Sequence, residues 1–327
     1  MVADSSRWQK SRCRDCASDL NLAQLLRPEK VVQPSENLFS IYPMLLAIDT
    51  RDPRAVEKRV AQDYWRMFPD GDAAFVARAF AWVERYFSGK NPDYFAIDAR
   101  YHDFEHTLQG TLAFSSLLRG RVEAGAAPVI SQEIFELGLL GILLHDTGYL
   151  KRRDDLEGTG AKYTATHVNR SADFAERLLW HHGYSLRQIH AVQHMIRCTG
   201  MGAKISAIPF QSEEERITGF ALGTADLLGQ MAAPDYPEKL PILFGEFLES
   251  SSFNAGKGEP PMMFSSTRDL MEKTPSFWRK YVIPKIENDF LGVFHFLARP
   301  APNGPNEYIE AIEANLVRLE KRLSLAA

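Results

Sequence analysis

The hydrophobic and polar positions of the chain follow the period of an α-helix from about residue 55 onward. In residues 55–68 and 73–87, apolar side chains recur at intervals of three and four, which is typical of amphipathic helices. No stretch shows the sustained alternation of apolar and polar residues that a half-buried strand requires. The pattern therefore predicts an all-α protein. Further helices are expected near residues 105–120, 131–147, 165–183, 185–197, 212–233, 238–250, 276–297 and 306–323.

The spacing of these helices divides the 327 residues into three expected parts. Residues 1–55 are polar and contain prolines, so we expect an irregular N-terminal extension. Residues 56–252 are expected to form a helical domain that carries the chemistry. After a loop rich in glycine and proline, residues 253–327 are expected to form a C-terminal helical extension, which packs against this domain or contributes to a homodimer contact.

The overall composition is that of an ordinary globular enzyme. The formal net charge of −4 at pH 7 gives no reason to expect a nucleic-acid partner. The sequence contains no run of about 20 apolar residues and no apolar segment typical of a secretory signal, so we expect a cytoplasmic protein without membrane contact. Cys13 and Cys16 form a CxxC motif, but the chain lacks the second ligand pair that a structural zinc site needs.

The dipeptide His145-Asp146 is the most informative feature of the sequence. It directly follows residues 134–144, a stretch so apolar that it suits a helix buried on all sides. An ionisable pair at the end of such a helix is costly to bury unless something compensates its charge, and a metal ion is the obvious compensation. Neighbouring helical positions lie about 100° apart. We therefore expect both side chains to reach one ion, with Asp146 also able to bridge to a second.

A second group of candidate ligands lies upstream and downstream of this dipeptide. His102 and His106 are four residues apart, which places them on one face of the expected helix. One of them can bind metal while the other points toward a substrate. His167, His194 and Asp226 follow in later helices. Imidazoles and carboxylates in this order are what a buried two-metal hydrolytic site requires.

The order HxxxH, an apolar helix ending in HD, and a later Asp resembles the HD superfamily of metal-dependent phosphohydrolases. The stretch YHDFEH is also similar to the YHNxxH signature of class I cyclic nucleotide phosphodiesterases. Two positions depart from those patterns: Asp103 replaces the Asn, and Tyr149 stands where the phosphodiesterase HDxxH motif has its second His. His167 and His194 look like the additional ligands of six-ligand members of the superfamily, including the HD-GYP type.

The resemblance implies roles for these residues. By it, the first metal is held by His106, His145, Asp146 and Asp226, and His102 is the acid that protonates the leaving oxygen. His167 and His194 would complete a second metal site. Asp103 and Glu105 are expected to orient the imidazoles, as residues around metal ligands commonly do. Lys151 follows the HD dipeptide closely, and we expect it to contact a phosphate oxygen of the substrate.

The sequence thus predicts a metal-dependent phosphohydrolase with His102 and Asp146 as catalytic groups. The expected reaction is phosphodiester hydrolysis of a nucleotide-like or other small phosphate ester by a metal-activated water. One or two divalent ions, Mn, Mg, Fe or Zn, are expected as cofactors, because the ligand types do not distinguish these metals. Two alternatives remain open at this point: a di-iron oxygenase that uses the same ligands, and a non-catalytic module that binds a nucleotide.

Overall fold

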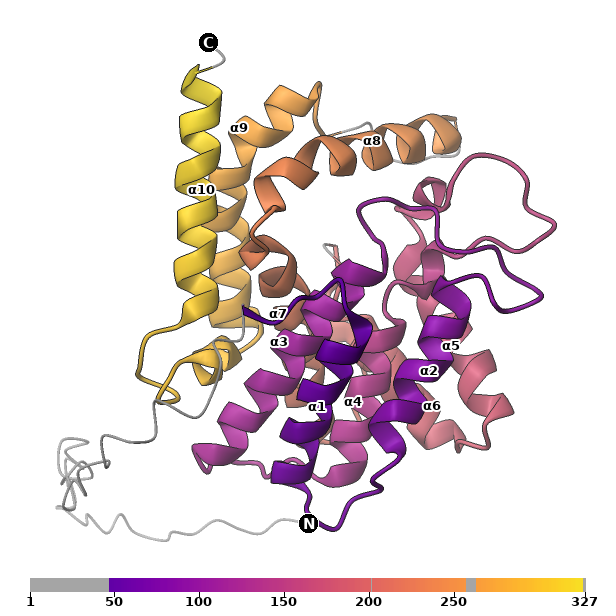
Figure 1. Cartoon of the computed structure of the whole chain (residues 1–327), viewed down its shortest axis with the longest axis vertical. Helices are drawn as coiled ribbons and strands as arrows, with labels where there is room; N and C mark the ends of the chain where they lie inside the picture. The colour runs from indigo at the N-terminus through magenta and orange to yellow at the C-terminus, as the bar shows by residue number, and fades with distance from the viewer. Residues whose placement is uncertain (1–46, 201, 257–262, 326–327) are drawn as a thin grey trace, which may run out of the picture. The chain divides into compact units, whose positions relative to one another are not determined.

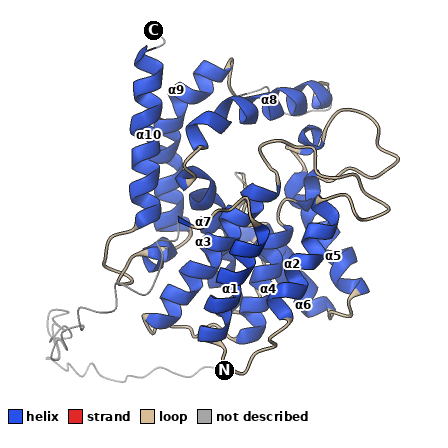
Figure 2. Ribbon diagram, in the orientation of Figure 1, coloured by secondary structure: helices blue, strands red, loops and turns tan. Residues whose placement is uncertain are grey.

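The computed structural model describes residues 47–200, 202–256 and 263–325. Most of the expected N-terminal extension, including Cys13 and Cys16, lies outside these ranges. The described residues form helices joined by loops, and they contain no β-strand (Figures 1 and 2). The predicted all-α fold is therefore confirmed. None of the helices in the described ranges is long and apolar enough to span a bilayer.

Ten α-helices make up most of the described chain. Their bounds are α1 Pro53–Met67, α2 Phe75–Phe87, α3 Phe104–Glu123, α4 Gln132–Leu144, α5 His167–His181, α6 Leu186–Ile196, α7 Glu213–Ala232, α8 Tyr236–Asn254, α9 Thr267–Phe277 and α10 Glu307–Leu325. Shorter turns of 3-10 helix lie at Thr147–Tyr149, Gly160–Tyr163, Ile205–Ala207 and Val293–Leu297, and π-helical turns at Trp278–Val282 and Lys285–Asp289.

Helices α3, α4 and α7 form the centre of the bundle (Figure 1). Each packs against the other two, while α1 lies on α3, and α6 packs on both α4 and α7. Every residue of α4 from Leu137 to Leu144 is buried, as its continuous apolar sequence predicts for a helix with neighbours on all sides. Side chains fix where two of the central helices begin: Ser131 caps the N-terminus of α4 by accepting from the amide of Ile134, and Ser212 caps the N-terminus of α7.

Two glycines allow α3 and α7 to approach closely. A Cβ atom added at Gly229 of α7 would lie 2.8 Å from the backbone of Gln109 and Gly110 in α3. A Cβ at Gly110 would lie 3.7 Å from the Cα atom of Asp226. Because His106 lies one turn before Gly110, and Asp226 about one turn before Gly229, this backbone contact fixes the separation of two predicted ligands.

Gly229→Ala is expected to destabilise the fold by about 1–3 kcal/mol, because the added methyl group overpacks a backbone contact. Pushing α3 away from α7 should also weaken metal binding through His106 and Asp226. Gly245→Ala in α8 is the matched control, since an added Cβ there meets no atom within 4 Å. Alanine at that exposed helical position should stabilise the protein slightly. Denaturant unfolding of both variants tests this, and equal unfolding free energies would contradict it.

The aromatic-rich helix predicted at 276–297 is present but ends earlier than expected. The chain is helical without a break from Thr267 to Asp289, because α9 continues through the π-helical turns Trp278–Val282 and Lys285–Asp289, with Ile283 and Pro284 in helical conformation between them. Leu291 and Gly292 adopt left-handed conformations, with φ of 55° and 65°, and a separate 3-10 turn follows at Val293–Leu297. Helix α8 continues to Asn254, past residue 252, and α10 packs against both α7 and α9. The tail is therefore packed against the central helices.

Candidate metal centre and its cavity

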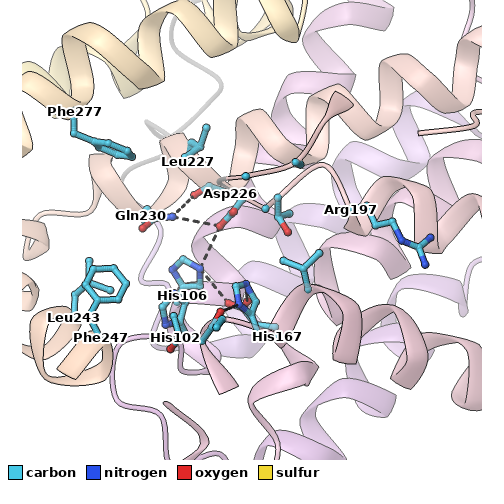
Figure 3. Close-up of a pocket in the computed structure, with 18 of the residues that line it drawn as sticks. His102, His106, His167, Arg197, Asp226, Leu227, Gln230, Leu243, Phe247 and Phe277 are labelled. Atoms are coloured by element: carbon cyan, nitrogen blue, oxygen red, sulfur yellow. Dashed lines mark hydrogen bonds and ion pairs between the residues drawn. The ribbon is translucent and has the colours of Figure 1, made fainter. Parts of the chain in front are cut away.

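A cavity of about 910 Å³ is lined by residues of α3, α5, α6, α7, α8 and α9 (Figure 3). Six residues predicted from the sequence line it: His102, His106, Asp146, His167, His194 and Asp226. His145 is fully buried beside them, and its Nε2 atom lies 3.3 Å from Oδ2 of Asp146. The fold therefore brings six predicted side chains, widely separated in the sequence, to the wall of one cavity, with His145 buried beside them.

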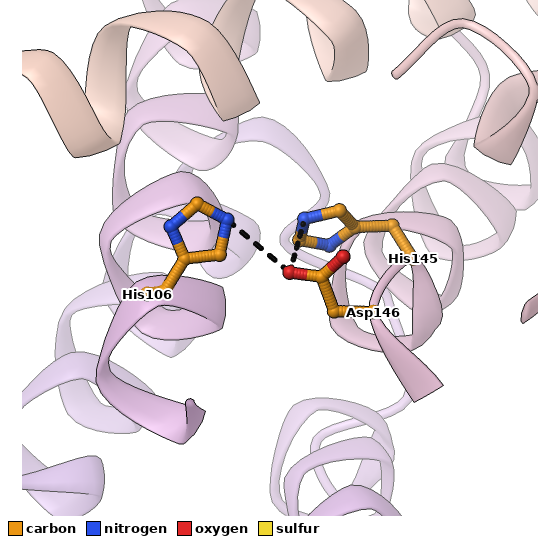
Figure 4. A group of neighbouring side chains, drawn as sticks. All are labelled: His106, His145 and Asp146. Atoms are coloured by element: carbon orange, nitrogen blue, oxygen red, sulfur yellow. Dashed lines mark ion pairs between the residues drawn. The ribbon is translucent and has the colours of Figure 1, made fainter. Parts of the chain in front are cut away.

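The tightest part of this cluster comprises His106, His145 and Asp146, and it could hold a metal ion (Figure 4). Oδ2 of Asp146 lies 3.2 Å from Nε2 of His106 and 3.3 Å from Nε2 of His145. Asp226 joins the same two imidazoles: its Oδ1 atom is 3.3 Å from His106 and 3.4 Å from His145. Two imidazole nitrogens and two carboxylate oxygens thus face one another in the protein interior.

The end of α4 positions the HD dipeptide differently from the sequence prediction. The helix ends at Leu144 and not at residue 147, so His145 is the capping residue and Asp146 lies outside the helix, with φ of −107° and ψ of 7°. The expected 100° step between successive helical positions is therefore wrong for Asp146. The chain turns there into the 3-10 turn Thr147–Tyr149, and this turn carries the carboxylate to both imidazoles.

The start of α3 also corrects a prediction. The helix begins at Phe104, with Asp103 as its cap, so His102 precedes the helix and does not share a helical face with His106. Asp103 accepts a hydrogen bond from the backbone amide of His106 at 2.9 Å, which fixes the helix start and does not orient an imidazole. Glu105 instead pairs with Lys239 at 2.9 Å. The expectation that Asp103 and Glu105 orient the imidazoles is wrong.

The hydrogen bonds of His145 support a metal ion in this cluster. Its Nδ1 atom lies 2.7 Å from the carbonyl of Ile142 and must donate to it, so Nε2 of the neutral ring carries a lone pair. Nε2 of His145 and Oδ2 of Asp146 are buried without a hydrogen-bond partner among the described residues. Two lone pairs at this distance repel unless a proton or a metal ion lies between them, and buried polar atoms without a partner are costly.

The distances within the cluster fit a first-row divalent ion. Such ions bind imidazole nitrogen and carboxylate oxygen at about 2.0–2.2 Å, which separates neighbouring ligand atoms by about 3.0–3.5 Å. The observed separations of 3.2 to 3.4 Å fall in this range. The electrostatics agree. Burial lowers the pKa of His106, but Asp146 and Asp226 outweigh it and raise that pKa to about 10, so their combined field favours positive charge at this point.

His167 lies near the second oxygen of the Asp146 carboxylate, and His194 lines the same cavity. Nε2 of His167 is 3.9 Å from Oδ1 of Asp146, while its Nδ1 donates to the carbonyl of Thr164 at 2.6 Å. His194 lines the cavity, and its Nδ1 lies 2.8 Å from the buried carboxylate of Glu215. In both residues the Nδ1 bond leaves Nε2 as the ligand atom, which is the usual arrangement around protein-bound metals.

The family to which the chain belongs is shown by its sequence. The model of the Npun_R2479-like family matches residues 81–321, which include every residue of the cluster. The chain belongs to this family. No curated protein matches the sequence significantly.

Two glutamates orient the histidines of the site, and the sequence analysis missed both. Glu246 of α8 lies 2.6 Å from Nδ1 of His102 and also accepts from the amide of Tyr101. Glu215 orients His194 in the same way, although it belongs to an acidic stretch that resembles a solvated first helical turn. Both carboxylates are buried. A glutamate within an apolar helix, such as Glu246 in ILFGEFL, is the signal that could have identified the first of them.

Tyr149 fills the position where the phosphodiesterase pattern has a second histidine. Its ring is fully buried and stacks between the rings of His102 and His167, with centroids 4.5 and 4.7 Å away. At this position it serves as a spacer that fixes the planes of the two imidazoles.

Lys151 lies apart from the other predicted residues. Its ammonium group is buried against the carbonyl of Gly158 and lies 3.4 Å from Asp98, and it does not line the cavity. The cations that do line the cavity are Arg197, Lys204 and Lys273.

Proposed function

We propose that this protein is a metal-dependent phosphohydrolase. The proposal depends on one observation: two imidazoles and two carboxylates converge with unpartnered buried atoms at the base of a cavity, beside a histidine paired with a buried glutamate. A divalent ion held by such ligands lowers the pKa of a water molecule and neutralises charge on phosphate oxygens. The resemblance of the motifs to the HD superfamily supports the same chemistry.

The protein's own residues divide into metal ligands and an acid. His106, His145, Asp146 and Asp226 would hold the first ion. The second oxygen of Asp146 faces His167 at 3.9 Å, which supports a second ion shared by Asp146, His167 and His194. Glu215 and the carbonyls of Ile142 and Thr164 fix the ring orientations in advance, so little side-chain ordering is needed on binding.

His102 is suited to protonate the leaving oxygen of the ester. Its Nδ1 donates to Glu246, which leaves Nε2 as the other ring nitrogen of a residue that lines the cavity. Burial raises the pKa of Glu246, but the charge of His102 and hydrogen bonds from Tyr101 and His102 lower it below the ordinary value overall. An ionised carboxylate at this point stabilises the imidazolium, the form of His102 that can donate a proton.

Arg197 is better placed than Lys151 to contact a phosphate group. It is half-buried at the cavity, and its guanidinium makes no hydrogen bond or ion pair with another described residue. A guanidinium in this state can donate two parallel hydrogen bonds to phosphate oxygens.

The test is to strip the protein of metal, reload it separately with Mn, Mg, Fe or Zn, and assay para-nitrophenyl phosphate and bis(para-nitrophenyl) phosphate. We expect at least one ion to restore hydrolysis and a chelator to abolish it, and elemental analysis gives the number of ions per chain. Hydrolysis that persists in the chelated protein would refute the proposal. Consumption of dioxygen by the iron-loaded protein without ester hydrolysis would favour the oxygenase instead.

A further inference from the structure

We propose that the substrate is an amphiphile, a phosphate ester that carries a hydrocarbon chain of several carbons. This inference rests on the proposed function, because the metal cluster fixes where the phosphate lies. The cavity of about 910 Å³ is at the upper end of the roughly 300–1,000 Å³ that small-molecule sites span. A phosphate group at the metal cluster leaves most of this volume to the remainder of the substrate.

The side of the cavity formed by α8 and α9 is apolar. In Figure 3, Leu243, Phe247 and Phe277 lie on one side of the histidines and Asp226, and Arg197 lies on the other. Leu240 and Leu270 extend this surface, which we call the apolar wall. An apolar surface of this kind gains free energy when a hydrocarbon chain replaces water against it.

The polar side chains near the apolar wall already have partners within the protein. The hydroxyl of Thr274 donates to the carbonyl of Leu270 at 2.9 Å. The amide of Gln230 donates to the carbonyl of Asp226 and accepts from the hydroxyl of Tyr101 at 2.8 Å. The ammonium of Lys273 pairs with Asp269 at 2.9 Å.

These internal bonds disfavour a nucleobase or sugar on this side of the cavity. Tyr236 also lies near the apolar wall. Its phenol hydroxyl makes no hydrogen bond with another described residue. A base edge or a sugar placed against the wall would exchange several hydrogen bonds with water for at most a few with protein, which costs free energy. A hydrocarbon chain incurs no such cost.

The inference is tested by titrating the metal-loaded protein with ethyl, butyl and octyl phosphate below their critical micelle concentrations. We expect the dissociation constant to fall with chain length, by up to about fourfold per methylene. AMP is the comparison ligand and should bind more weakly than octyl phosphate. A dissociation constant that does not change with chain length, or tighter binding of AMP, would overturn the inference.

Three variants localise the effect on α8. Leu243→Ser and Phe247→Ser should each weaken octyl phosphate binding by about 10- to 100-fold and leave ethyl phosphate binding within about twofold. Leu248→Ser is the matched control, because Leu248 lies on the same helix, is 49% exposed and does not line the cavity. If Leu248→Ser weakens octyl phosphate binding as much as Phe247→Ser does, the apolar wall is not the binding surface.

Hydrolysis of ethyl, butyl and octyl para-nitrophenyl phosphate separates this inference from the proposed function. Hydrolysis with a kcat/KM that is independent of chain length would refute the amphiphile and leave the phosphohydrolase standing. Binding that depends on chain length without any hydrolysis would retain the amphiphilic ligand and refute the phosphohydrolase. A rise of kcat/KM with chain length supports both.

Discussion

Asp146→Ala is expected to abolish metal binding and ester hydrolysis together. The carboxylate of Asp146 lies within 4 Å of three imidazoles, those of His106, His145 and His167, so it is the residue shared by both parts of the cluster. Its removal takes away a negative charge and two ligand atoms that no other described side chain can replace. Elemental analysis after gel filtration and the para-nitrophenyl phosphate assay measure the two losses on the same sample.

Two further variants separate loss of metal from loss of fold. Asp146→Asn keeps the volume of the side chain and removes its charge, so it should fold as the wild type does and still lose most of its metal affinity. Asp173→Ala is the matched control, because Asp173 is an exposed aspartate of α5 outside the cavity. Asp146→Ala protein that folds and retains its metal at the wild-type stoichiometry would show that the cluster is not the metal site.

The bundle could be predicted from the sequence because its helices are amphipathic or wholly apolar over their whole lengths. The predicted helices 212–233 and 185–197 agree closely with α7 and α6, since Ser212 and Ser185 mark their starts with capping hydrogen bonds. Periodicity was less informative at 276–297. Its apolar residues suit a helix and the chain is helical there as far as Asp289, but the left-handed conformations of Leu291 and Gly292 end the helix before residue 297.

The candidate ligands could be named from the sequence, but their geometry could not. His145 and Asp146 were recognisable because a buried apolar helix ends in an ionisable pair. Where α4 ends depends on tertiary contacts that the sequence pattern does not show, so the helical step assumed for Asp146 was wrong. Glu246 was missed for a similar reason: it is distant from His102 in sequence, and only the packing of α8 near the start of α3 brings the two together.

His102→Ala is expected to retain its metal and to lose about 10²- to 10⁴-fold in kcat, which is the usual contribution of a general acid. The loss should depend on the leaving group. para-Nitrophenolate is a weak base and can leave without being protonated, whereas an alkoxide is a strong base and needs a proton as it leaves. The variant should therefore be impaired least on para-nitrophenyl phosphate and most on an alkyl phosphate. A plot of kcat against the pKa of the leaving alcohol measures this, and its slope should be steeper for His102→Ala than for the wild type.

The pH dependence gives an independent check of the same role. A general acid must carry a proton to act, so we expect kcat of the wild type to fall at high pH and this fall to be absent in His102→Ala. Glu246 has a lowered pKa, so its carboxylate stays charged even below the ordinary pKa of a glutamate. Its ion pair with His102 is lost only as the pH falls through the lowered pKa of Glu246. At pH values above this lowered pKa, the acid side of the profile should therefore reflect groups other than Glu246.

Glu246→Gln tests whether the glutamate acts through His102. The amide keeps the size of the side chain but removes the charge that stabilises the imidazolium, so the fall of kcat with rising pH should begin at lower pH than in the wild type. If Glu246 had a purely structural role, Glu246→Gln would lower the stability of the protein without changing the pH at which kcat begins to fall. If His102→Ala reduces kcat equally for all leaving groups, His102 positions the substrate and the proton comes from another source.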